Sequence, residues 1–124
     1  LPLFLFIVIM SPSSEAITLQ LKYKDVYLSY FYKTKKYVEA LTSGDVIKFD
    51  EEGCTDEKGN RVLIFSGKFK EEMAKFLNKG YKPLSAKVNN LLFWKQEDIE
   101  DETLILLPQI EFIRDDAADH FSRI

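Results

Sequence analysis

The sequence predicts one α+β domain, with a mostly antiparallel sheet of five to seven strands and two helices packed on one face. Residues 61–112 read as strand, helix, strand and strand. Two predicted helices each carry a stripe of apolar residues, and these stripes need a sheet to pack against. The connections between the predicted elements are short, which favours antiparallel hairpins over parallel crossovers.

The composition sets the class of protein. A chain of 124 residues with 46% hydrophobic residues is long and apolar enough for one packed core. We expect the domain to span residues 1–114, and residues 115–124 to be a tail or the start of a following segment. The net charge of −3 argues against a protein that coats nucleic acid by bulk electrostatics, although a local basic face remains open.

The apolar run at residues 1–10 has two interpretations. Its Ile, Val and Phe content favours a strand buried on both faces, whereas the SPSSEA that follows is also typical of the end of a secretory signal. Ten residues are too few to span a bilayer as a helix, which takes about 20. We favour the strand, and the absence of Met at position 1 suggests a piece of a longer protein.

The first half of the chain predicts a strand and a helix. Residues 16–24 alternate apolar and polar side chains, so we expect a half-buried strand that forms a hairpin with residues 1–10. Asp25 is a good helix N-cap and Gly44 a good terminator, which predicts a helix over residues 26–42. Its aromatic start, DVYLSYF, leaves open a continuation of the strand.

The second half contributes most of the sheet. We expect a solvated loop or hairpin tip at residues 50–60, where Gly53 and Gly59 supply positive backbone angles. Ser66 is expected to cap a helix that Gly80 closes, and residues 96–102 to form an acidic turn. The remaining predicted strands cover residues 46–49, 61–66, 86–94, 103–107 and 110–113.

The chemistry-bearing residues are few. One cysteine, Cys54, and one histidine, His120, cannot supply a multi-Cys metal site or a Ser/His/Asp triad, and no phosphate-binding loop motif occurs. We therefore expect no catalytic residue, no metal and no cofactor, with Cys54 an unreactive turn residue. The acids of residues 98–102 are interpreted as a hairpin tip rather than a cation site, and Asn89-Asn90 as a strand pair with one amide in solvent.

Basic and aromatic residues gather between the first strand and the following helix. Lysines neutralise phosphates and flat rings stack on bases, so the pattern indicates a nucleic-acid surface. The competing interpretation is an amphipathic helix with tyrosines at the core boundary and lysines in water. The candidate binding residues are Lys24, Tyr32, Lys33, Lys35 and Lys36, within a set that also holds Lys22, Tyr23, Tyr27, Tyr30 and Tyr37.

Most of residues 1–113 resembles a known family. The segment FSGKFKEEMAKFLNKGYKPLSAKVNNLLFWK and the later LLPQIEF are similar to an accessory, non-motor region of large bacterial RecQ-like ATP-dependent DNA helicases. The resemblance implies a non-catalytic module of a cytoplasmic protein. Its expected partners are single- or double-stranded DNA and the helicase motor of the same polypeptide, with no membrane role.

Two functions follow as expectations. The first is an accessory domain that assists DNA binding or positions a strand beside the motor, with little sequence readout. The alternative is a protein interaction or structural domain without a nucleic-acid role, secreted if residues 1–10 are a signal remnant.

Overall fold

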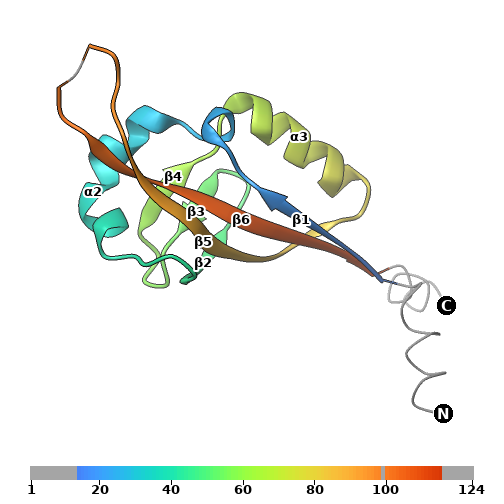
Figure 1. Ribbon diagram of the computed structural model, residues 1–124. Coiled ribbons are helices and arrows are strands. Elements are labelled where there is room, and N and C mark those ends of the chain that lie inside the picture. The colour runs from blue at the N-terminus through green and yellow to red at the C-terminus, as the bar shows by residue number, and fades with distance from the viewer. Residues whose placement is uncertain (1–13, 99, 116–124) are drawn as a thin grey trace, which may run out of the picture.

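Six antiparallel strands form one curled sheet in the order β1-β6-β5-β2-β3-β4, accompanied by two α-helices (Figure 1). This computed structural model describes residues 14–98 and 100–115. The predicted α+β fold is confirmed. The elements in chain order are β1 (Ser14–Gln20), η2 (Tyr23–Asp25), η3 (Leu28–Tyr30), α2 (Phe31–Glu39), β2 (Val46–Phe49), β3 (Gly53–Thr55), β4 (Arg61–Ile64), α3 (Gly67–Asn78), β5 (Lys82–Trp94) and β6 (Thr103–Asp115).

The long strands β5 and β6 form the centre of the sheet, joined through the expected acidic turn. The two strands predicted at residues 103–107 and 110–113 are in fact one, because β6 continues through Pro108. A proline cannot donate a ladder hydrogen bond. The Pro108 carbonyl accepts a hydrogen bond from the Leu21 amide on the β1 side, so the proline nitrogen also faces β1 and its missing hydrogen removes no bond between β5 and β6. The register of β5 shifts between Val88 and Asn90, which forms a bulge.

Strand β1 lies at the edge of the sheet and pairs with the end of β6, from Ser14 opposite Asp115 to Gln20 opposite Gln109. The first and last described residues are therefore neighbours (Figure 1). The strand predicted over residues 16–24 ends early, since Tyr23–Asp25 is a 3₁₀ turn. The hairpin predicted with residues 1–10, the signal interpretation and the tail with His120 lie outside the described residues.

The sheet curls until β4 meets the chain that follows β1. Val26 forms an antiparallel bridge with Phe65, the Tyr27 amide donates to the Ile64 carbonyl at 3.0 Å, and the Ser66 amide donates to the Asp25 carbonyl at 2.8 Å. The helix predicted over residues 26–42 is therefore wrong at both ends, and α2 covers only Phe31–Glu39. The β-branched Val26 serves the sheet instead of the helix, consistent with its preference for extended backbone.

Strand β3 was missed in the predicted loop at residues 50–60. It pairs with both β2 and β4, and Gly53 makes the close approach possible. A Cβ atom at Gly53 would lie 2.1 Å from the Leu63 carbonyl oxygen. Gly53 has no positive φ, which corrects that part of the prediction, whereas Gly59 does, at 90°. Close packing of backbones, rather than a turn, therefore requires the glycine at position 53.

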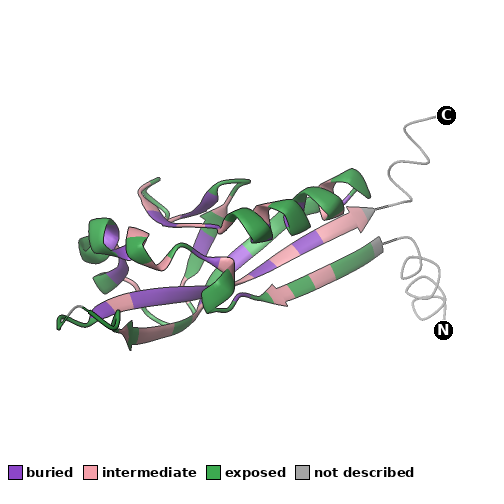
Figure 2. Cartoon of the chain, turned by 90° about the horizontal axis from the view of Figure 1, so that it is seen from above, coloured by how far each residue is buried: buried purple, intermediate pink, exposed green. Residues whose placement is uncertain are grey.

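Helix α3 follows its prediction closely. The Ser66 hydroxyl accepts a hydrogen bond from the Phe69 amide at 3.2 Å, and Gly80 ends the element with a φ of 93°. Phe69 and Met73 are buried, and the Phe76 ring lies 5.6 Å from that of Phe112 on β6. Figure 2 shows the outer surface of α3 exposed, while β6 is buried along much of its length.

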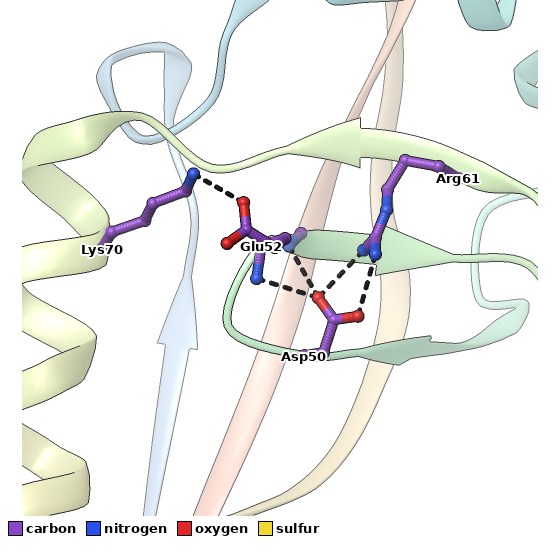
Figure 3. Close-up of polar contacts among 5 residues, drawn as sticks. Asp50, Glu52, Arg61 and Lys70 are labelled. Atoms are coloured by element: carbon purple, nitrogen blue, oxygen red, sulfur yellow. Dashed lines mark hydrogen bonds and ion pairs between the residues drawn. The ribbon is translucent and has the colours of Figure 1, made fainter.

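Surface ion pairs join the β2–β3–β4 region to itself and to α3 (Figure 3). Arg61 donates two hydrogen bonds to the Asp50 carboxylate, at 2.9 and 3.0 Å, and Asp50 also accepts from the Gly53 amide. Lys70 on α3 reaches Glu52 at 2.9 Å. Exposed pairs contribute about 0–1 kcal/mol each, so the buried side chains carry most of the stability.

Candidate nucleic-acid interface

The interface predicted from the sequence lies on the segment that connects β1 to β2. Residues 22–37 contain five lysines and one acid, Asp25, within a chain of net charge −3. All five lysines are exposed. None of the ion pairs within the described residues involves these lysines, so their charges face solvent.

The buried stripe of α2 determines which of its side chains point outward. Phe31, Thr34 and Val38 are buried, and the Thr34 hydroxyl donates to the Val62 carbonyl on β4 at 2.9 Å. Lys33 and Lys36 lie on the remaining, exposed part of the helix surface. Packing of the helix on the sheet therefore presents these two lysines to solvent at fixed positions.

Tyr32 is joined by an aromatic partner that the sequence did not indicate. Its ring centroid lies 6.3 Å from that of Trp94 at the end of β5, with the planes tilted by 50°. Tyr32 keeps 39% of its surface exposed and the neighbouring Phe93 keeps 66%. The contact spans α2 and β5, which are far apart in the sequence, so only the sheet order brings them together.

Two of the predicted residues have acidic surroundings. Lys35 shares a shallow cavity with Tyr32, Asp101 and Glu102, and these carboxylates weaken its attraction for a phosphate. Lys24 lies on η2, in a cavity lined also by Glu72 of α3. The structure thus leaves Lys33 and Lys36 exposed on α2 away from these acids, whereas Tyr32 and Lys35 share the carboxylates of Asp101 and Glu102 and Lys24 has Glu72 as an acidic neighbour.

The remaining tyrosines divide into two groups. Tyr23 and Tyr27 are 45% and 47% exposed, which leaves their rings available for stacking. Tyr30 and Tyr37 are half-buried, as expected for rings at the core boundary. Lys36 places its ammonium 5.0 Å from the centre of the Tyr37 ring, a cation–π contact that holds the lysine close to α2.

The other candidates for chemistry have structural roles. Cys54 lies in β3 rather than in a turn and is fully buried, and burial raises the pKa of its thiol far above the usual range. A thiol of this kind is a poor nucleophile. Among the described residues, no group of three or more His, Cys, Asp or Glu side chains is placed to hold a metal ion.

Asn89 and Asn90 lie on β5 at the bulge, with Asn89 half-buried and Asn90 exposed. In the described part of the chain, no helix has the length and apolar character needed to cross a membrane. Comparisons of the chain with protein-family models, with curated proteins and with solved structures find no match.

Proposed function

We propose that this chain is a non-catalytic module that binds DNA and positions it, with α2 as the main contact surface. The lysines of α2 contact phosphates and the tyrosines at its start stack on bases. The similarity to the accessory region of RecQ-like helicases supports placing such a module beside a DNA-unwinding motor in a bacterial, cytoplasmic protein. In that setting its partners are a single or double strand of DNA and the motor of the same polypeptide.

One observation carries this proposal. Lys33 and Lys36 are exposed on α2, outside the ion pairs found within residues 14–98 and 100–115, and the exposed Tyr32 ring lies on the same helix. Unneutralised cations next to an exposed ring supply the two contacts that single-strand binding needs, charge for the backbone and a flat face for a base.

The test is fluorescence anisotropy of a labelled single-stranded 20-mer over a salt series. Affinity should fall as salt rises, because lysines that neutralise phosphates release counterions. The double variant Lys33→Gln/Lys36→Gln should bind more weakly and lower the slope of log K against log salt by about 1.4. Lys68→Gln/Lys75→Gln is the matched control, since it removes the same charge from the exposed side of α3.

The outcomes separate the alternatives. Equal losses in the two double variants would mean that only overall charge matters, which contradicts a defined surface on α2. If the Lys33→Gln/Lys36→Gln variant binds the 20-mer as tightly as the wild type, Lys33 and Lys36 are not part of the interface. Absence of binding at low salt would reject the DNA-binding function.

A protein interaction domain is the second candidate, favoured by the exposed ring of Phe93 on β5. Phe93 pairs directly across the ribbon with the half-buried Leu104, so two apolar side chains lie side by side near the end of the β5–β6 hairpin. Exposed apolar pairs of this kind are common in interfaces. Replacing Phe93 with Ser should leave oligonucleotide binding intact if this ribbon serves a protein partner.

A further inference from the structure

A small polar groove lies where the chain leaves β1 and passes the bulge of β5. Its floor is apolar, formed by the buried Leu21 and Leu107. Its walls carry Gln20, Lys22, Tyr23 and Asn90, all of them exposed. The cavity measures about 230 Å³.

The backbone around the groove is fixed by hydrogen bonds. Leu21 donates to the Pro108 carbonyl at 3.0 Å, which holds the end of β1 against β6. The Asp25 carboxylate accepts from the Lys22 amide at 2.9 Å, and the Asp25 amide donates to the Lys22 carbonyl at the same distance. Tyr23 therefore lies on a hydrogen-bonded turn that the Ser66 amide, at the start of α3, joins to the rest of the fold.

The bulge in β5 positions Asn90, whose side-chain amide lines one wall of the groove. The register of β5 shifts between Val88, which pairs with Pro108, and Asn90, which pairs with Leu107. Bulges re-aim side chains and often adjoin functional sites. Within the described residues, no hydrogen bond uses the side-chain amide of Asn90, and that of Gln20 makes only a long contact of 3.5 Å to Gln109. Both amides are thus available to a ligand.

We propose that this groove binds one unstacked base of a single-stranded nucleic acid. The Tyr23 ring supplies the stacking face, the amides of Asn90 and Gln20 meet polar atoms at the edge of the base, and Lys22 contacts the adjacent phosphate. This inference rests on the proposed function and narrows it from DNA in general to a single strand whose bases are turned toward the protein.

The size of the groove supports a single base. The groove volume of about 230 Å³ leaves room for one heterocyclic base. Bases in a duplex have their faces covered by their neighbours, so a duplex cannot offer one to Tyr23 without unstacking. The groove therefore selects single strands, of DNA or of RNA.

Two 20-mers of equal charge test the inference, one of thymidine nucleotides and one of abasic deoxyribose phosphates. The wild-type protein should bind the thymidine strand more tightly than the abasic strand, because bases stack both on Tyr23 and on the α2 tyrosines. Tyr23→Ala should reduce this ratio by about fivefold or more, the contribution expected from one stacked base. Tyr23→Phe should retain the ratio, and neither variant should change the salt slope set by the α2 lysines. A uridine 20-mer compares RNA with DNA.

A second measurement does not depend on the lysines of α2. Titration of ¹⁵N-labelled protein with thymidine 5′-monophosphate should shift the side-chain amide signals of Asn90 and Gln20, and Asn90→Leu should weaken this binding. A ratio of affinities that Tyr23→Ala leaves unchanged, together with unshifted amide signals, would overturn the groove while leaving binding by α2 intact. Shifted amides without any binding of 20-mers would instead reject the proposed function and keep the groove as a nucleotide site.

Discussion

Replacing Gly53 with alanine tests whether β3 truly lies against β4. The added Cβ would lie 2.1 Å from the Leu63 carbonyl oxygen and 2.7 Å from the Ile64 Cα. Both are backbone atoms, so no side-chain rotation can relieve the contact, and the two strands must separate where Gly53 pairs with Ile64. We expect a loss of about 3 kcal/mol or more, at or above the upper end of ordinary overpacking.

The assay is urea unfolding followed by far-UV circular dichroism. With a slope of about 1.5 kcal/mol/M, Gly53→Ala should lower the midpoint by about 2 M. Gly67→Ala is the matched control, because the nearest atom to its added Cβ is the Tyr27 hydroxyl oxygen at 4.0 Å. That change lies in the first turn of α3 and should leave stability unchanged or raise it by up to about 1 kcal/mol. A Gly53→Ala midpoint equal to that of the wild type would refute the close approach of the strands.

Three further predictions concern α2, the surface ion pair and the thiol. Thr34→Val should cost about 1–2 kcal/mol in chemical denaturation because the Val62 carbonyl loses its donor. Thr103→Val, at another buried threonine, should cost less, since no side-chain hydrogen bond in the described structure uses the Thr103 hydroxyl. The Arg61 guanidinium lowers the pKa of Asp50 from 3.8 to about 2, so its stabilisation is present above pH 3.8 and is lost as pH falls toward 2. Asp50→Asn should make the free energy of unfolding depend less on pH between 3.8 and 2. The same pH dependence as in the wild type would contradict this prediction. Cys54 should react with a thiol reagent only after unfolding, and rapid labelling of native protein would contradict its burial.

The parts of the fold that local sequence controls were predictable. Helix α3 has its cap, its apolar stripe and its terminating glycine within one short segment, and β2 was predicted to the residue. Strand β3 was not predictable, because three residues in a polar stretch show no periodicity and depend on strands at either side. The start of α2 was mispredicted because the distant Phe65 engages Val26 in a bridge.

In the candidate site, too, local features were predictable from the sequence and contacts between distant elements were not. Exposed lysines on α2 follow from helical periodicity, so their orientation was accessible from the sequence. The contact between Tyr32 and Trp94 joins residues from two elements, and the acids near Lys35 come from the turn just before β6. Such neighbours depend on the order of strands in the sheet, which composition and spacing do not determine.

The pairing of Ser14 with Asp115 means that the chain enters and leaves the described fold at one point. Directly opposed residues in antiparallel strands lie only about 5 Å apart. A few glycines and serines would suffice to join these positions, and new ends could then be opened in the acidic turn between β5 and β6. A circularly permuted protein made in this way should keep the same sheet, and a host polypeptide could carry the fold as an insertion without separating its own flanking segments.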